Sequence, residues 1–583
     1  MTLKPSPQPP GTMNRSIVVA VDYGTTFSGV AWAQSARPDI QTTIIQWPDT
    51  EGSLEGATSD KVPTELAGHG RNRKWGFGIA DDASRHQWFK LGLDPTQESD
   101  VVSYLTLNYP DPKALPPSYD SSREAVVLTT DYLGCLRRHT SKILRLRLGD
   151  GVVDTTPIRY IITVPAIWDD AAKARTQHCA QSAGMGEDIR VISEPEAAVV
   201  HALDALDPHN LIPGDTFVLC DAGGGTVDLI SYSVVSLNPK VQIREAVAGS
   251  GASCGSTFLN RIFRQYFEKE FGDSEGYGDD TLEEALSDFE NNAKRKFTGD
   301  GNVIIRVTGL ADDPTRGVKR GKLTLTSEKM QALFEPIMST ITTLVKNQLK
   351  HTKQAKAVIL VGGFGGSPYL QKTIQKVVGN VEVLQPAHGW TAVVRGALKR
   401  ALNEDAPDTC RIQLALRVAR KACGIRVDRS FNPHLHDTSR KHFDEYSGRD
   451  RITVMDWFVK QGDEIDQDMP LTLEYFSTRR VSSGPFGYYS TEVFSFAPSS
   501  EAEPPLYSNN GKFRSSESMK KLVVLEADLS PIARSTIPID KGMDGQDYYV
   551  LTFQIKVKFF SAHTQYSLWY NGVEYGNVKA EYA

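Results

Sequence analysis

The sequence predicts a mixed α/β protein in which two lobes of similar build precede a β-rich domain. Two strand–turn–strand units, at residues 17–30 and 216–230, each consist of an apolar run, an acid, a glycine-containing turn and a second apolar run. Each unit is followed by short strands and amphipathic helices, as expected for α/β folds. Over residues 551–559 apolar and polar residues alternate, which indicates a strand with one buried and one solvated face.

The elements of the two lobes follow from apolar spacing and end signals. Short buried strands are expected at residues 160–166, 191–193 and 358–361. Helices are expected at residues 123–148, 169–183, 197–205, 258–271, 281–297, 323–350 and 391–402. Asp169 or Asp170 can cap the second of these helices, and Pro195 suits the first turn of the third. In the β-rich domain, Asn571-Gly572 predicts a tight hairpin turn.

Length and composition indicate a protein of several globular domains. A chain of 583 residues exceeds one core, and 40% apolar with 23% charged residues is ordinary for globular proteins. The net charge of −6 and the absence of a basic stripe argue against nucleic-acid binding. Six cysteines are scattered without a CxxC pair, which predicts reduced, buried thiols and a location in the cytosol or nucleus.

The sequence predicts no association with a membrane. No apolar stretch approaches the roughly 20 residues that a membrane helix needs. Residues 1–15 contain four prolines and have no apolar core. We therefore expect this segment to be a disordered tail and not a signal peptide.

The turn of the second strand–turn–strand unit has the groups that bind a phosphate beside a metal ion. Three consecutive glycines can bring backbone N–H groups close to an anion, and the threonine adds a hydroxyl. The residues of this turn are Gly223, Gly224, Gly225 and Thr226. Asp221 and Asp228 flank it, and they can hold Mg²⁺ or its waters. The alternative is a plain hairpin turn, which needs no flanking acids.

The first unit repeats this design with Asp22 followed by Gly24, Thr25 and Thr26. Two such turns predict two lobes that face one nucleotide, with Asp22 and Asp221 sharing the metal ion. A third glycine-rich turn, with Gly362 and Gly363, follows a buried strand and precedes a helix. Glycines there would let a base or ribose lie against the backbone.

At these residues the chain resembles the actin, hexokinase and heat-shock ATPase superfamily, and most of all the seventy-kilodalton heat-shock (DnaK-type) chaperones. Five phrases occur in the family's order, at residues 22–28, 162–166, 192–198, 221–228 and 361–363. The resemblance covers residues 16–402. It implies a two-lobed actin-like ATPase with duplicated RNase H-like lobes, followed by a C-terminal β-sandwich-like domain. The chain resembles the divergent branch of the family that has no helical lid.

The expected organisation has five parts. Residues 1–15 form the tail, residues 16–213 lobe I and residues 214–402 lobe II. A linker and connecting segment follows at residues 403–470, and the β-rich domain occupies residues 471–583.

The resemblance also implies individual roles. Glu194 is expected near the metal ion and the γ-phosphate, although an acid that complements a helix dipole is the plainer interpretation. Gly255 matches a phosphate-contacting glycine in the turn predicted at residues 248–256. Lys294 and Arg295 match a basic pair that brackets adenine, with a solvated helix end as the alternative. Thr226 and Asp228 would align the attacking water.

The chain departs from the family pattern at several positions. The family's catalytic lysine has no direct match, and Lys90 is its nearest replacement, with an unrelated surface lysine as the alternative. The family's ribose-binding glutamate falls on Asn291, or on Glu290 if the helix has slipped by one residue. The adenine-facing arginine falls on Gly366, and the leucine-rich interdomain linker is missing.

These observations predict an ATP-binding, slowly hydrolysing, chaperone-like protein that uses ATP or ADP and Mg²⁺. A nucleotide-sensing interaction protein with little turnover is the alternative, and a small-molecule kinase on the same fold is the second alternative. Unfolded polypeptide or a regulatory protein is the expected partner of the C-terminal β domain, with no nucleic-acid or membrane partner.

Overall fold

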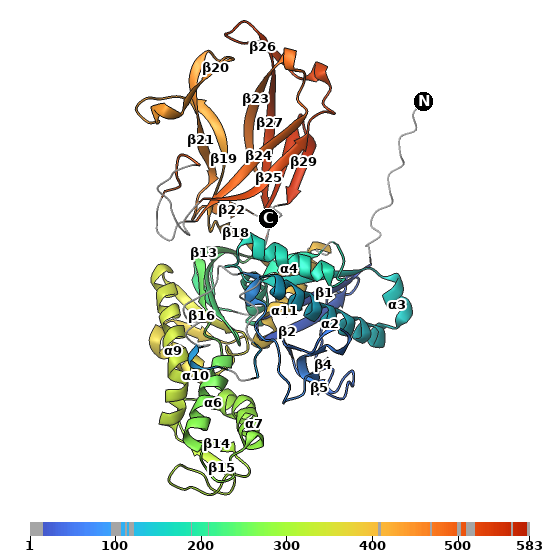
Figure 1. Cartoon of the computed structure of the whole chain (residues 1–583). Coiled ribbons are helices and arrows are strands. Elements are labelled where there is room, and N and C mark those ends of the chain that lie inside the picture. Colours follow the sequence, from blue (N-terminus) through green and yellow to red (C-terminus); the bar gives the residue numbers. More distant parts are fainter. Residues whose placement is uncertain are drawn as a thin grey trace. The chain divides into compact units, whose positions relative to one another are not determined.

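The computed structural model describes residues 15–94, 107–110, 113–115, 122–187, 189–207, 209–405, 410–466, 469–497, 503–508, 519–560 and 564–579. The chain divides into two compact units, the first ending at Leu414 and the second beginning at Ala415 (Figure 1). The predicted tail lies outside the described residues apart from Arg15. Most of the proline-rich segments at residues 108–119 and 498–518 lies outside them as well.

The first sheet of unit 1 is built around the strand that ends in Asp22. Its order is β10 (Arg190–Ser193), β9 (Ile158–Val164), β1 (Ile17–Asp22), β2 (Phe27–Gln34) and β3 (Thr42–Thr43), and β6 (Val62–Pro63) also pairs with β2. β1 runs antiparallel to β2 and parallel to β9. All six residues of β1 are buried, as is usual for a strand covered on both faces.

The second sheet of unit 1 repeats this arrangement. Its order includes β17 (Glu382–Leu384), β16 (Ala355–Val361), β11 (Thr216–Ala222), β12 (Val227–Ser236) and β13 (Val241–Ala252). β11 runs antiparallel to β12 and parallel to β16. Each sheet therefore contains one acid-tipped hairpin beside a parallel strand, which confirms the predicted duplication. β13 continues to Ala252, so the turn predicted at residues 248–256 is confined to the residues after it.

Helices of lobe I and the last helix of unit 1 pack beside the first sheet. They are α2 (Ser122–Leu148), α3 (Asp150–Thr155), α4 (Asp170–Ser182), α5 (Glu194–Ala205) and α11 (Ala392–Asp405). Asp169 caps α4 by accepting a hydrogen bond from the Ala172 N–H. α11 crosses α5 so closely that a Cβ on Gly396 would lie 1.6 Å from the Ala197 carbonyl oxygen. Only glycine fits this crossing, which ties α11 to lobe I.

Lobe II carries the remaining helices of unit 1. They are α6 (Thr257–Phe271), α7 (Asp279–Asp288), the π-helix η6 (Phe289–Ala293), α8 (Lys294–Lys296), α9 (Ser327–His351) and α10 (Pro368–Val378). The hairpin of β14 (Val303–Arg306) and β15 (Lys322–Leu325) lies beside α6 and α7 (Figure 1). The spacing of α6 predicts a stripe of core residues, and all of them are buried except Tyr266, which is half-buried: Phe258, Ile262, Phe263, Tyr266 and Phe267.

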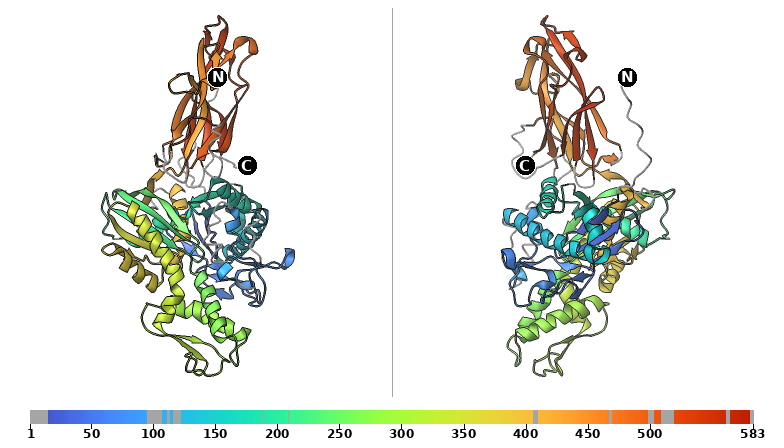
Figure 2. Two further views of the ribbon diagram at one scale, coloured as in Figure 1. Left: turned by 60° about the vertical axis from the view of Figure 1, so that its left-hand side comes forward. Right: turned by 90° about the vertical axis from the view of Figure 1, so that its right-hand side faces the viewer.

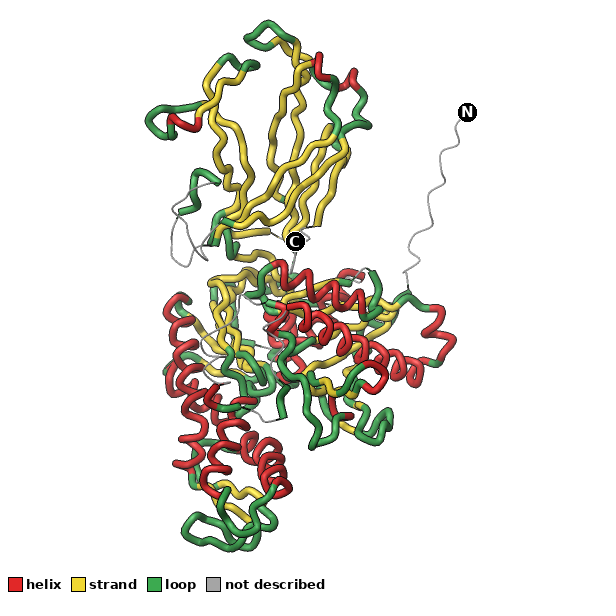
Figure 3. Tube along the Cα trace, in the orientation of Figure 1, coloured by secondary structure: helices red, strands yellow, loops and turns green. Residues whose placement is uncertain are grey.

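Unit 2 consists of strands in two layers (Figures 2 and 3). One sheet has the order β20 (Lys441–Asp444), β21 (Arg449–Val459), β19 (Ala422–Ser430), β24 (Tyr488–Phe496) and β25 (Lys520–Asp528). The other contains β26 (Ile539–Lys541), β23 (Leu471–Arg480), β27 (Asp547–Phe559), β28 (Thr564–Tyr570) and β29 (Val573–Lys579). Apolar residues of both sheets form one core, which confirms the predicted sandwich. Asn571 and Gly572 both have positive φ, as the predicted tight turn requires.

The predicted linker and connecting segment at residues 403–470 differs from what the structure contains. Strands β19, β20 and β21 within it belong to the first sheet of unit 2, and β18 (Ile412–Val418) pairs with β22 (Glu464–Asp466) through residues 416–418. Short polar stretches between these strands obscured their alternation in the sequence. Residues 406–409, which include part of the expected polar linker, lie outside the described residues.

All six cysteines are buried and free, as predicted. Within the ranges that the structure covers, no helix has both the length and the apolar character needed to span a membrane.

Candidate functional site

The turns of the two acid-tipped hairpins contact each other. A Cβ on Gly224 would lie 2.2 Å from the Thr26 Oγ1 atom, and a Cβ on Gly225 would lie 3.0 Å from the Thr25 Cγ2 atom. The glycines of the second turn therefore make room for the threonines of the first. This contact brings the ends of β1 and β11, which belong to different sheets, to a single place.

Backbone N–H groups at both turns are available to an anion. The Gly223 N–H donates to the Thr226 carbonyl at 2.9 Å and closes the second turn. In the described part of the chain, no backbone carbonyl accepts from the N–H groups of residues 24–26 or of Gly224 and Gly225. Such free donors on adjacent residues of a turn suit a phosphate group.

Two other glycine-containing turns donate hydrogen bonds to backbone carbonyls of the second hairpin. The Gly255 N–H donates to the Gly225 carbonyl at 3.0 Å, and the Thr257 N–H donates to the Gly224 carbonyl at 2.9 Å. The Gly255 N–H is therefore already bonded within the protein, and the phosphate contact expected of Gly255 stays a prediction. The N–H of Phe364 donates to the Ala222 carbonyl at 2.9 Å, so the third turn supports the other end of the hairpin.

The four predicted acids line one small inner cavity of about 70 Å³. They are Asp22, Glu194, Asp221 and Asp228, and residues 223–226 and Gly362 line the same cavity. Asp221 and Asp228 are direct partners across the β11–β12 ladder. Asp221 is half-buried in terms of its exposed surface. The surrounding protein nevertheless desolvates its carboxylate and raises its pKa to about 7. Burial also raises the pKa values of Glu194 and Asp228.

Two buried lysines bring positive charge into this cavity. The Lys90 Nζ atom donates to the Glu194 Oε1 atom at 2.7 Å, and the Lys90 side chain is 2% exposed. The alternative of an unrelated surface lysine is therefore wrong. The Lys61 Nζ atom donates to the Asp22 Oδ2 atom at 2.6 Å, and Lys61 is 8% exposed. Lys61 was not predicted as a site residue.

The donor set fits a directly bound magnesium ion poorly. Among the described residues, no group of three or more His, Cys, Asp or Glu side chains is arranged to hold a metal ion. Both oxygens of Asp22 already accept hydrogen bonds, from Lys61 at 2.6 Å and from the Thr163 hydroxyl at 3.3 Å. An ammonium in contact with the carboxylate would repel a divalent cation placed there. Magnesium at Asp22 and Asp221 therefore stays a prediction.

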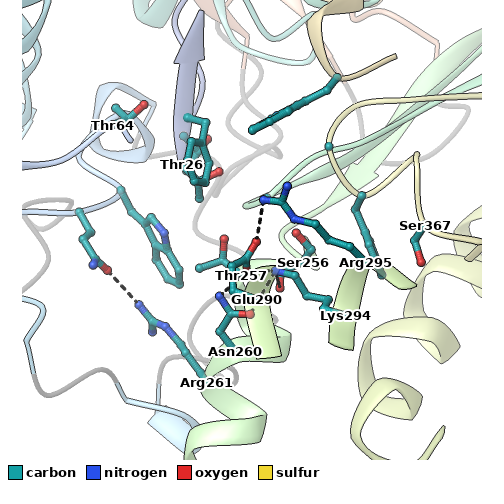
Figure 4. A pocket seen from close by; sticks show the side chains of 18 of the residues that line it. Thr26, Thr64, Ser256, Thr257, Asn260, Arg261, Glu290, Lys294, Arg295 and Ser367 are labelled. Atoms are coloured by element: carbon teal, nitrogen blue, oxygen red, sulfur yellow. Dashed lines mark hydrogen bonds and ion pairs between the residues drawn. The ribbon is translucent and has the colours of Figure 1, made fainter. Parts of the chain in front are cut away.

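A larger outer cavity of about 440 Å³ adjoins the inner one and shares with it Thr25, Thr26, Phe27, Gly224, Gly363 and Trp390. Its volume lies within the range typical of small-molecule sites, roughly 300–1,000 Å³. Both lobes contribute to its wall, lobe I through residues such as Thr64 and lobe II through residues such as Asn260 (Figure 4).

The predicted basic pair lies at this outer cavity beside a glutamate. Lys294 forms an ion pair with the Glu290 Oε2 atom, and Arg295 reaches Glu290 Oε1 at 3.5 Å (Figure 4). The π-helix η6 accommodates one extra residue before α8, so Glu290 lines the cavity while Asn291 is exposed and bonds to Ser287. The one-residue slip considered for the ribose-binding glutamate is therefore what the structure contains. Gly366 lines the same cavity, with no side chain in the place of the family's arginine.

Trp390 forms a wall common to both cavities, and it was not predicted as a site residue. Its ring packs edge-on against Phe27 at 5.8 Å, and the Arg295 guanidinium lies 5.7 Å from its centre. A Cβ on Gly363 would lie 3.0 Å from the indole nitrogen, so the third turn packs tightly against this ring. No local pattern marked Trp390, because its contacts come from segments far apart in the chain.

Comparison with known proteins finds similarity to Hsp70 proteins over part of the chain. The family model described as Hsp70 protein matches residues 148–402, which contain Glu194, the second hairpin, the basic pair and the third turn. Heat shock 70 kDa protein 12A of Mus musculus is 24% identical over 493 residues, which cover 66% of this chain and 69% of that protein. Heat shock 70 kDa protein 12B of Homo sapiens is 24% identical over 531 residues, 74% of each chain.

A chaperone protein DnaK of Nitrosopumilus maritimus is 26% identical over 262 residues, 43% of this chain and 39% of its own. These matches are consistent with a divergent member of the Hsp70 family. The α/β unit of the chain accordingly has the Hsp70 and actin-like ATPase fold, followed by a β-rich region. This similarity supports nucleotide binding, and the paired hairpins and adjoining cavities are the candidate site.

Proposed function

We propose that this Hsp70-family chain binds one ATP or ADP between its two lobes and hydrolyses ATP slowly, as a chaperone-like protein. The observation that supports this most is the contact of Thr26 with Gly224, which joins the phosphate-binding turns of both lobes at one pair of cavities. The phosphates would occupy the inner cavity, and the nucleoside would occupy the outer one.

The turns would bind phosphate oxygens through the N–H groups of residues 24–26 and of Gly224 and Gly225. Donors fixed in place before the reaction stabilise developing charge without reorganisation. Lys90 carries a positive charge to the same cavity, and Glu194 holds its ammonium at 2.7 Å. Thr226 and Asp228 line the cavity as well and would orient the attacking water.

In the outer cavity, Glu290 would accept hydrogen bonds from the ribose hydroxyls. Asn260 donates to the Glu290 Oε2 atom at 2.7 Å and Lys294 pairs with the same carboxylate, so its position is held from two sides. Arg295 and Trp390 would pack on the faces of the base, since a guanidinium and an indole both stack on flat rings.

Unit 2 would bind unfolded polypeptide or a regulatory protein. The support for this is its two-sheet sandwich, together with the name chaperone carried by the DnaK relative. Nucleotide-dependent control of this binding requires that the partner have different affinities for the ATP and ADP states.

A single-turnover experiment tests the proposed hydrolysis. Purified full-length protein loaded with γ-labelled ATP should release phosphate at a measurable first-order rate, and an unfolded peptide should change that rate. Asp221→Ala should abolish release, because it removes the cross-strand partner of Asp228, the acid that would orient the attacking water. ATP that survives for hours on the wild-type protein would instead favour the nucleotide-sensing alternative. A failure to retain ATP would refute nucleotide binding itself.

A further inference from the structure

Strand pairing and hydrogen bonds of its neighbours fix the position of Lys61 at the phosphate end of the site. Lys61 directly precedes β6, which pairs with β2 in the register Ser28–Val62. The Ser28 and Thr64 hydroxyls are 2.9 Å apart, and the Thr64 N–H donates to the Thr26 carbonyl at 2.8 Å. These bonds fix the segment that carries Lys61 to the strand that leaves the first phosphate turn.

The aliphatic part of the Lys61 side chain packs against the backbone of Gly29. A Cβ on Gly29 would lie 3.3 Å from the Lys61 Cγ atom and 3.6 Å from its Cε atom. Gly29 is the cross-strand partner of Asp22. The aliphatic part therefore crosses the open face of Gly29, and the Lys61 ammonium reaches the Asp22 carboxylate one strand away.

The ammonium lies where a bound cation would be needed. Lys61 lines the inner cavity together with Asp22 and Asp221, the two acids expected to share a metal ion. A phosphate group facing these acids requires positive charge between them and itself. Lys90 supplies positive charge beside Glu194 in the same way, through a separate ion pair.

We propose that the Lys61 ammonium acts as a tethered cation in place of the divalent ion at Asp22, so that this chain binds nucleoside di- or triphosphates with little dependence on Mg²⁺. The inference rests on the proposed nucleotide site and specifies how its charge is balanced. A side-chain cation is always present, whereas a bound ion must be recruited from solution.

Calorimetric titration of the full chain with ADP, in excess Mg²⁺ and in EDTA, tests the proposal. For the wild-type protein, EDTA should raise Kd by less than about 5-fold, which is less than the contribution of one charged hydrogen bond. Lys61→Met should raise Kd in EDTA by about 10–100-fold, the loss of one such bond, and Mg²⁺ should restore most of the affinity. Lys61→Arg retains the charge and should resemble the wild type. Lys74→Met, at an exposed lysine, is the matched control.

Several outcomes would overturn the proposal. A wild-type affinity that falls by about 100-fold or more in EDTA would mean that a divalent ion supplies the charge. An unchanged Kd for Lys61→Met in EDTA would mean that the ammonium does not face the phosphates. The wild-type comparison decides the question even if Lys61→Met fails to fold. Absence of ADP binding by the wild type in both solutions would refute the proposed function, and the inference with it.

Discussion

Alanine at Gly255 should lower the affinity for nucleotide by about 100-fold or more, the effect of losing two charged hydrogen bonds. A Cβ there would lie 2.3 Å from the Gly224 carbonyl carbon and 2.5 Å from the Gly225 nitrogen. Both neighbours are backbone atoms, so the second phosphate turn must move. The N–H groups of Gly224 and Gly225 would then no longer point into the inner cavity. Calorimetric titration with ADP measures the loss.

Gly278→Ala is the matched control for this substitution. A Cβ on Gly278 meets nothing within 4 Å, and its φ of −164° is extended backbone that alanine adopts freely. The control should bind ADP like the wild type. Thermal unfolding of both variants separates a local displacement of the turn from loss of the fold. If Gly255→Ala were folded and bound ADP normally, the second turn would not be a phosphate site.

Methionine at Lys90 should reduce the single-turnover rate of ATP hydrolysis by about 100–1,000-fold, the usual effect of removing one group that stabilises the transition state. Lys90 is the cation nearest to Glu194 in the inner cavity, and it is held at 2.7 Å. Its loss removes positive charge from the place where charge develops on the phosphates. Affinity for ATP should change much less than the rate, because the backbone donors of both turns remain.

The double variant Lys90→Met/Glu194→Gln controls for stability. Removing one partner of a buried ion pair destabilises a protein by about 3–5 kcal/mol, because the other charge is left unpaired. The double variant leaves no unpaired charge and should recover stability, while its hydrolysis stays slow. Recovery of hydrolysis along with stability, or a rate for Lys90→Met close to the wild type, would contradict a direct role for Lys90.

The hairpins could be predicted from the sequence because each is a local feature. An apolar run, an acid and a glycine turn are contiguous, and their spacing determines the strand, the turn and the position of the carboxylate. Asp22 and Asp221 could be paired because the same design occurs twice in one chain. The buried aromatic stripe of α6 and the Asn571-Gly572 turn followed from local spacing in the same way.

What could not be predicted depends on contacts between distant segments. Lys61 is 39 residues from Asp22, and only the register of β6 on β2 and the bare face of Gly29 bring the two together. Lys90 was named as a candidate, but its pairing with Glu194, 104 residues away, was not predicted. Glu290 depends on a π-helical turn, which shifts a side chain by one position without a clear sequence signal. The strands of residues 422–459 were missed because polar side chains break their alternation.

Hydrogen exchange of the full-length protein, with and without saturating ADP, shows whether turns from two lobes bind one nucleotide together. If they do, ADP slows exchange in both residues 23–27 and residues 222–227 of the same molecules. Slowing confined to one of these turns, or absent from both while ADP is bound, would contradict binding by both turns.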